Sequence, residues 1–111
     1  MLIDSDTITF LVNPQVKIEP GMYKLERIKL SEIDVVFKGI ANREFFYWEN
    51  VDESIEWLKE NFEKTFPVIL EKLKDKYYSV DGHHRITAAL EIGKDEILAF
   101  TREVKKLSYP R

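Results

Sequence analysis

Residues 76–93 constrain the fold of this chain more than any other stretch, because a strand pattern passes there directly into a helix pattern. Residues 76–80 are rich in aromatic and β-branched side chains, which is typical of a short strand. Residues 86–92 are followed by Gly93, which favours a helix that ends at this glycine. Residues 81–85 therefore span a strand-to-helix turn, and they include both histidines of the chain.

The side chains of this turn predict an anion site. We expect the Asp81 carboxylate to cap the helix, and Gly82 to allow a tight bend and close approach of a ligand to the backbone. His83, His84 and Arg85 then fall in the first helical turn, where the helix dipole disfavours cations by about 0.3 to 1 kcal/mol each. A bound phosphate would remove this conflict, because the N–H groups, the dipole, an arginine fork and one or two imidazoles would all face it.

Two other interpretations of the turn remain open. In the structural one, Asp81 caps the helix, Gly82 turns the chain, and the basic side chains are solvated or pair with some of the 20 acidic residues. In the other, the histidines bind a metal, but adjacent helical residues diverge by about 100°, so His83 and His84 do not readily share one ion. We therefore expect no metal site built from protein side chains, whereas Mg²⁺ that arrives with a nucleotide needs only oxygen ligands.

The rest of the chain alternates between strand and helix patterns. Strands are predicted at residues 8–12, 22–30, 66–73, 77–80 and 97–104. Apolar residues change face along the second of these, which predicts a bulge or twist near Glu26, and we expect the first half of the last strand to be buried on both faces. A helix capped by Asp52 is expected to run to about Phe62. One clear hairpin without strict βαβ alternation favours an α+β fold, a compact mixed β-sheet with a few helices, in a single domain over residues 1–111.

Residues 31–50 follow neither period and are expected to form a long loop with a short ordered piece. A loop of this length in a small domain is more often functional than idle. Arg43 and Glu44 are candidates to reach a phosphate and to accept a proton, and Asp81 is a second candidate base or metal ligand. The aromatic run at 45–48 is a candidate for stacking on a base, although core packing is the commoner role.

Composition narrows the chemistry and the compartment. The chain has no cysteine, which rules out disulfides, thiolate catalysis and cysteine zinc sites. The N-terminal residues lack the basic start and long apolar stretch of a signal peptide, and no run approaches the ~20 apolar residues of a membrane span. We therefore expect a cytoplasmic protein that does not enter a membrane. The net charge of -3 gives no overall attraction to nucleic acid.

Residues 78–93, with their Asp-Gly-His-His-Arg turn and the strands on either side, resemble the core of the ParB/sulfiredoxin superfamily. The resemblance is strongest over residues 66–104 and weaker over 23–65. It implies a ParB/sulfiredoxin-like fold and a nucleotide site in which this turn holds the phosphates. Sulfiredoxins carry their reactive cysteine at the position of His83, so the absence of cysteine excludes sulfinic-acid reduction.

The branches of the superfamily imply different activities. Partition-type members bind CTP and carry a helical DNA-reading domain, which we do not expect here because few residues follow Val104 in this sequence. The form of the turn most resembles that of the free serine kinases, which transfer phosphate from a nucleotide to serine. In those kinases an acidic residue of the upstream loop serves as base, and Glu44 is the nearest candidate. The kinases are longer than this chain, so serine specificity stays open.

Two functions are therefore expected. In the first, the domain binds ATP or ADP, with CTP as a further candidate, together with Mg²⁺, and transfers or hydrolyses the terminal phosphoryl group. The candidate catalytic residues are then Glu44, Asp81 and His83, and the nucleotide-binding residues are Arg43, Gly82, His83, His84 and Arg85. In the second, the domain is a non-enzymatic nucleotide-sensing or DNA-associated accessory module. A homodimer that buries the aromatic run of the long loop is a further expectation.

Overall fold

The computed structural model describes residues 2–11, 18–34 and 51–107. Most of the loop predicted at 31–50 therefore lies outside the described residues, together with Arg43, Glu44 and the aromatic run. The strands are β1 (Leu2–Asp4), β2 (Met22–Lys29), β3 (Val68–Leu73), β4 (Lys76–Asp81) and β5 (Glu96–Glu103). The described helices are α1 (Ser5–Leu11), α2 (Val51–Glu60) and α3 (His83–Glu91), with the short 3-10 turns η1 (Leu30–Glu32) and η3 (Phe62–Lys64).

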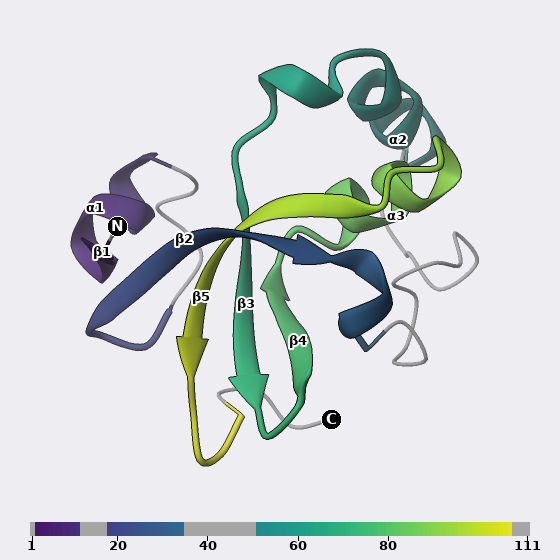
Figure 1. Ribbon diagram of the computed structural model, residues 1–111. Coiled ribbons are helices and arrows are strands. Elements are labelled where there is room, and N and C mark those ends of the chain that lie inside the picture. The colour runs from purple at the N-terminus through teal and green to yellow at the C-terminus, as the bar shows by residue number, and fades with distance from the viewer. Residues whose placement is uncertain (1, 12–17, 35–50, 108–111) are drawn as a thin grey trace.

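The described strands form one five-stranded sheet in the order β1-β2-β5-β3-β4 (Figure 1). Neighbouring strands are antiparallel except β3 and β5, which run parallel. The sheet is therefore mixed, and helices and strands do not alternate as they would in a doubly wound fold. The predicted α+β mixed sheet is confirmed.

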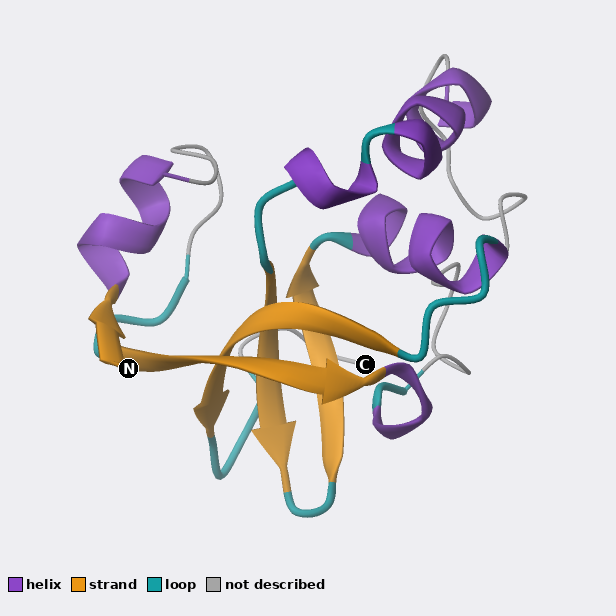
Figure 2. Cartoon of the chain, turned by 45° about the horizontal axis from the view of Figure 1, so that its top comes forward, coloured by secondary structure: helices purple, strands orange, loops and turns teal. Residues whose placement is uncertain are grey.

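The sheet buries apolar side chains on both of its faces. One face packs against α3. The core between this face and the helix includes Ile28, Leu30, Val68, Leu70, Ile86, Ala89, Ile97 and Ala99. The other face is partly covered by α1. The smaller core there consists of Ile8, Tyr23, Ile69 and Phe100. Figure 2 shows α2 and α3 together near one end of the sheet, with α1 apart from them at the other end. The candidate turn thus lies on the side of the molecule that α2 and α3 build.

Strand β2 contributes to both of these cores, which explains its apolar pattern. Tyr23 belongs to one core and Ile28 to the other. The pairing of β2 with β5 continues without a register shift. The predicted bulge near Glu26 is therefore wrong, because apolar residues occur on the two faces of a regular strand whose faces are both covered.

The strand predicted at residues 8–12 is also wrong, because Ile8 lies in α1. The carboxylate of Asp4 accepts hydrogen bonds from the backbone N–H of Thr7 at 2.9 Å and from the Thr7 hydroxyl at 3.1 Å. This contact satisfies an N–H group of the first helical turn, as an N-cap does. Ile8 is fully buried against Tyr23 and Phe100. The cap and this packing together outweigh the strand preference of a β-branched and aromatic run.

The other predicted elements are present with small changes. The helix predicted from Asp52 to about Phe62 is confirmed as α2, Val51–Glu60, and the predicted cap by the Asp52 side chain lies outside what the structure describes. The hairpin is confirmed as the antiparallel pair β3 and β4. In β5, Ile97 and Ala99 are buried but Leu98 is 37% exposed, so the first half of this strand is buried on one face only.

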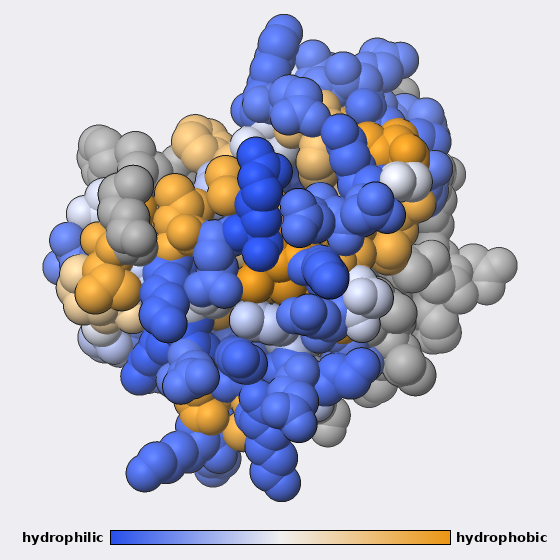
Figure 3. All heavy atoms as spheres, viewed as in Figure 1, coloured by the Kyte–Doolittle hydropathy of each residue, from blue (hydrophilic) through white to orange (hydrophobic). Residues whose placement is uncertain are grey.

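Hydrophilic side chains cover most of the face shown in Figure 3, as a 33% share of charged residues predicts. Smaller apolar patches lie between them (Figure 3). None of the described helices is long and apolar enough to cross a membrane.

Candidate functional site

The turn between β4 and α3 is built around Gly82. This glycine is the N-cap of α3, with φ 106° and ψ 25°, and its carbonyl oxygen accepts from the N–H of Ile86 at 2.9 Å. Glycine adopts such a left-handed conformation without steric cost. The predicted strand-to-helix turn is confirmed, and His83, His84 and Arg85 stand in the first turn of the helix.

Asp81 binds Arg85 and does not cap α3. The N-cap has no side-chain hydrogen bond, whereas Nη2 of Arg85 donates to Oδ2 of Asp81 at 2.6 Å. Nη1 of Arg85 donates to the carbonyl oxygens of Phe66 at 2.9 Å and Pro67 at 3.1 Å. The predicted capping role of Asp81 is therefore wrong, because β4 extends through Asp81 and places its carboxylate beside this guanidinium. Arg85 therefore pairs with an acidic residue, and its contact with phosphate stays a prediction.

His83 is connected to the strand that precedes it. Its Nε2 lies 2.7 Å from Oγ of Ser79, and its carbonyl oxygen accepts from the hydroxyl of Thr87 at 2.9 Å. Ser79 is only 1% exposed, so it orients the imidazole from within the protein. Sequence reasoning missed Ser79, although its separation of four residues from His83 across a tight turn is the signal that could have found it. The predicted contact of His83 with phosphate stays a prediction.

A pocket of about 290 Å³ lies at the N-terminus of α3. It is lined by Leu58, Asp81, Gly82, His83, His84 and Arg85. All residues predicted to bind phosphate from this turn therefore meet at one pocket, whereas Arg43 and Glu44 lie outside the described residues. The N–H groups of a first helical turn have no acceptor within their helix, so this end of α3 presents donors and a positive dipole end. Leu58 of α2 also lines the pocket and was not predicted as part of the site.

Burial lowers the pKa of His84 below its ordinary value, because desolvation disfavours the imidazolium form. The positive charge of Arg85 lowers this pKa further, and the Asp81 carboxylate opposes the shift. At neutral pH, the His84 ring is therefore mainly neutral in the protein without ligand. A phosphate placed beside the ring would raise its pKa, so binding would take up protons.

The shifted pKa of His84 predicts a pH dependence of stability. Because this pKa is lower in the folded protein than in the unfolded chain, the unfolded chain binds more protons between the two values. Stability is thus fully present above the unfolded pKa and is lost as the pH falls from about 6.5 towards the folded value. Between about pH 7.5 and about pH 5.5, we expect the Tm of the wild type to fall more steeply than that of His84→Gln. Circular dichroism melting curves measure this, and equal slopes for the two proteins would contradict a neutral, desolvated His84.

Within the described residues, no group of three or more His, Asp and Glu side chains is arranged to hold a metal ion. The described part of the pocket contains one carboxylate, that of Asp81, and Arg85 already binds it. These side chains do not fit a Mg²⁺ site of the protein's own. A Mg²⁺ ion here would be coordinated by phosphate oxygens and water.

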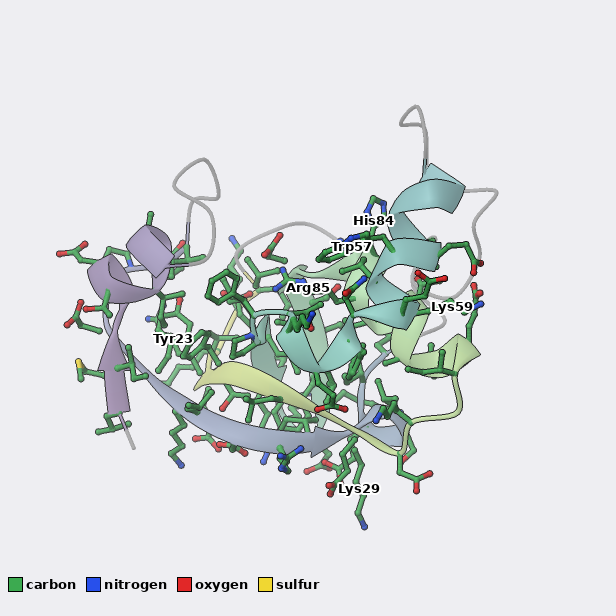
Figure 4. All side chains as sticks on the ribbon, turned by 90° about the horizontal axis from the view of Figure 1, so that it is seen from above. Tyr23, Lys29, Trp57, Lys59, His84 and Arg85 are labelled. Carbon is green, nitrogen blue, oxygen red and sulfur yellow. The ribbon has the colours of Figure 1, made fainter. Side chains whose placement is uncertain are left out.

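A second pocket, of about 300 Å³, adjoins the first at the ion pair of Arg85 and Asp81. It is lined by Trp57, Leu58, Lys64, Thr65, Phe66, Asp81 and Arg85. Figure 4 shows Trp57, His84 and Arg85 on the side of the helices, with Lys29 far from them at the opposite side of the view. Sequence reasoning did not single out this pocket. The signal that could have found it is Trp57, a large aromatic residue that does not lie on the buried side of α2 where Ile55 lies.

Solved structures with a similar fold come from two kinds of protein. Sulfiredoxin from Arabidopsis thaliana matches with a TM-score of 0.54 and 17% sequence identity, over 73% of this chain and 86% of that one. A pNOB8-like ParB N-domain matches with a TM-score of 0.53 and 19% identity, over 75% of this chain and 31% of that one. The present chain thus spans about a third of the length of that ParB protein. At these identities the likeness shows the fold alone, and no curated protein matches the sequence.

The family to which the sequence belongs follows from a match over most of its length. Residues 19–109 match the model of the ParB N-terminal domain. The matched segment contains every described strand except β1, and the β4–α3 turn with its pocket lies inside it. The chain therefore belongs to the ParB N-terminal domain family.

Proposed function

We propose that this domain binds the phosphates of a nucleoside di- or triphosphate at the β4–α3 turn and transfers or hydrolyses the terminal phosphoryl group. The observation that carries the proposal is the pocket at the N-terminus of α3, where Gly82, His83, His84 and Arg85 converge. Helix N-termini favour anions because their N–H groups and dipole point at the ligand. ATP or ADP is the proposed nucleotide, with CTP as the second candidate.

Each residue of the turn has a distinct part in this proposal. The backbone N–H groups of the first helical turn donate to phosphate oxygens, and the His84 ring becomes protonated as the phosphates approach. A guanidinium has five N–H donors. Arg85 uses three of them for Phe66, Pro67 and Asp81, so donors remain for an anion. The same contacts hold the guanidinium in place, which lowers the entropic cost of using it.

Phosphoryl transfer needs mainly positioning and charge neutralisation from the protein. The oxygen of an acceptor hydroxyl, such as that of serine, or of water attacks the terminal phosphorus. The bond from this phosphorus to the bridging oxygen of the nucleotide breaks, and the shortened nucleotide leaves. The proton of the attacking group passes to a carboxylate, for which the family resemblance suggests Glu44. Mg²⁺ bound to the phosphates would neutralise part of their charge.

A second candidate function is binding without turnover, as a nucleotide-sensing or DNA-associated module. The observation that favours it is the ion pair of Asp81 with Arg85 at 2.6 Å. Oδ2 of Asp81 already accepts from Arg85, so this carboxylate is less available to take a proton from an attacking hydroxyl. Among the described residues of the pocket, Asp81 is the one carboxylate, so turnover depends on a base from elsewhere in the chain.

Thermal shift and phosphate release with ATP, ADP, CTP and GTP, each with and without Mg²⁺, test the proposal. Ligand at about 100 times its Kd stabilises the folded state by roughly 2.7 kcal/mol, which raises the Tm by roughly 10 °C or more in a domain of this size. We expect at least one nucleotide to produce such a shift in the wild type and a smaller shift in His84→Ala. Lys29→Ala, which removes a positive charge far from the turn, is the matched control and should respond like the wild type (Figure 4).

The outcomes separate the two candidate functions. If no nucleotide changes the Tm of the wild type, phosphate binding at this turn is wrong. If nucleotides bind, but neither phosphate release nor transfer to serine or another hydroxyl is detected, binding without turnover is the better description. Titration with double-stranded DNA at several salt concentrations tests DNA association, since binding to phosphates weakens as salt rises.

A further inference from the structure

We infer that a pocket beyond the carboxyl end of β5 binds a small organic molecule through its carboxylate or phosphate group, which Arg102 holds. This β5-end pocket has a volume of about 540 Å³ and is lined by Glu19, Arg102, Glu103, Val104, Lys105, Lys106 and Leu107. The site is independent of the proposed function.

The β5-end pocket is separate from the pocket at the β4–α3 turn. Strands β3 and β5 run parallel and β4 runs antiparallel to β3, so the carboxyl ends of β4 and β5 lie at opposite ends of the sheet. In Figure 1 the arrowhead of β5 points away from α2 and α3. The two pockets have no described lining residue in common. A ligand of the β5-end pocket is therefore a second molecule and not another part of a nucleotide at the turn.

Arg102 has a buried hydrogen-bond donor that lacks an acceptor. Its Nη1 is buried, and among the described residues this atom has no hydrogen-bond partner. A buried donor without an acceptor destabilises the folded state, and more so when the group is charged. Arg85 shows the usual arrangement, because its guanidinium donates to Asp81 and to two carbonyl oxygens. A bound oxyanion would give Nη1 of Arg102 its acceptor.

The start of β2 positions the Arg102 guanidinium at the β5-end pocket. Burial raises the pKa of Tyr23, and the nearby Arg102 guanidinium lowers it, which places the guanidinium close to this phenol. The Tyr23 hydroxyl donates to the carbonyl oxygen of Glu19 at 2.8 Å. Nε of Arg102 lies 3.9 Å from the position that a Cβ on Gly21 would occupy. The guanidinium is thus beside the segment that carries Glu19 into β2.

The charges around the pocket favour an anion. Three of the lining residues are basic and two are acidic: Arg102, Lys105 and Lys106 against Glu19 and Glu103. Glu103 lies opposite Lys72 of β3 in register, which offsets its charge. The buried Glu71 lies opposite Arg102 but does not accept from Nη1. The exposed Glu19 is therefore the acidic residue that most directly opposes an anion here.

The pocket suits an organic anion better than a bare ion. Its volume lies within the range of about 300 to 1,000 Å³ that is usual for small-molecule sites. Val104 and Leu107 contribute partly buried apolar side chains, and the N–H of Val104 donates to the carbonyl oxygen of Lys72 at 2.9 Å, which fixes this wall. A guanidinium pairs with two oxygens of a carboxylate or of a phosphate. The oxyanion thus binds at Arg102, and the organic part lies along Val104 and Leu107.

A titration followed by ¹H–¹⁵N NMR tests this site. Phenyl phosphate and benzoate carry the two kinds of oxyanion on the same apolar ring, and sodium chloride at equal ionic strength is the control. We expect at least one of the two compounds to produce saturable shifts in the amide signals of residues 102–107 and in the Nε–H signal of Arg102. The compound that saturates at the lower concentration identifies the oxyanion. The signals of residues 82–86 report separately on the β4–α3 turn.

Three substitutions provide the second measurement. We expect Arg102→Gln to weaken binding about 10- to 100-fold, as loss of a charge-assisted hydrogen bond does. Arg27→Gln removes the same charge from an exposed position of β2 outside the pocket and should bind like the wild type. Glu19→Gln removes the opposing carboxylate and should bind about 1.5- to 5-fold more tightly. Melting curves without ligand check that the variants fold.

The results separate this site from the proposed function. If neither compound shifts the signals of residues 102–107 more than sodium chloride does, the inference is wrong. It is also wrong if Arg102→Gln binds like the wild type or, should that variant not fold, if Glu19→Gln binds no more tightly than the wild type. The response of residues 82–86 to ATP judges the proposed function, so either site can fail while the other stands.

Discussion

Substitution of Gly82 by alanine is expected to lower the free energy of unfolding by about 2 to 5 kcal/mol, the largest single effect that the structure predicts. Gly82 has φ 106°, where a side chain is strained by about 1 to 2 kcal/mol. An added Cβ would also overlap Cγ1 of Val68 and lie 2.8 Å from its Cβ and 3.3 Å from its Cα. Val68 is fully buried in the central part of the sheet, so it cannot move away without disturbing the core.

Urea denaturation of Gly82→Ala and Gly93→Ala measures this effect with a matched control. Gly93 also has a positive φ, of 76°, but an added Cβ there has no atom within 4 Å. Gly93→Ala should therefore show the conformational strain alone, about 1 to 2 kcal/mol. If Gly82→Ala is no less stable than Gly93→Ala, the close approach of the turn to Val68 is not a constraint on this fold.

Substitution of Arg85 by alanine is expected to have the second largest effect, a loss of about 2 to 3 kcal/mol in stability together with loss of nucleotide affinity. Three hydrogen bonds disappear, and the carboxylate of Asp81 and the carbonyl oxygens of Phe66 and Pro67 lose their donor. The side chains of Arg85 and Asp81 are 15% and 22% exposed, so water replaces the lost contacts only in part. The segment that leads into β3 is then no longer tied to α3.

A double-mutant cycle of Asp81→Ala with Arg85→Ala, followed by urea denaturation, isolates the contribution of the pair. We expect a coupling of about 1 to 2 kcal/mol, because removing both partners leaves no unpaired charge. Arg85→Lys should recover only part of the stability, since an ammonium cannot reach three acceptors in the geometry of a guanidinium.

Lys94→Ala is the control for that cycle, because it removes an ion pair with Glu63 whose side chains are 40% and 82% exposed. It should cost no more than about 1 kcal/mol. If Arg85→Ala is as stable as Lys94→Ala, the network around Arg85 has no stabilising role.

The elements that the sequence predicted well are those in which neighbouring residues decide the conformation. The strand before Asp81, the bend at Gly82 and the helix that ends at Gly93 all follow from local patterns. The prediction failed at Ile8, where a cap from Asp4 and packing against Tyr23 turn a strand-like run into a helix. Such packing partners are distant in the sequence, so a local pattern does not reveal them.

The candidate site likewise combines features that follow from neighbouring residues with contacts between residues distant in the sequence. The composition of residues 81–85 predicted an anion site at the start of a helix. The structure places these residues around a pocket there, and phosphate binding itself stays a prediction. The partners of Arg85 could not be predicted, because the carbonyl groups of Phe66 and Pro67 reach it from the segment before β3. The paired histidines are likewise separated by their surroundings. His83 contacts Ser79, whereas burial makes His84 a weaker base.

By itself, the sequence determined a strand-to-helix turn around a glycine, with two histidines and an arginine on the first helical turn. It could do so because caps, bends and helix starts depend on residues a few positions apart. Only the tertiary structure decided that Val68 lies against Gly82, that Arg85 is engaged by Asp81 and two carbonyl groups, and that α2 brings Trp57 beside them. These contacts arise from the order of the sheet, in which the parallel pairing of β3 with β5 and the packing of α2 on α3 join distant segments.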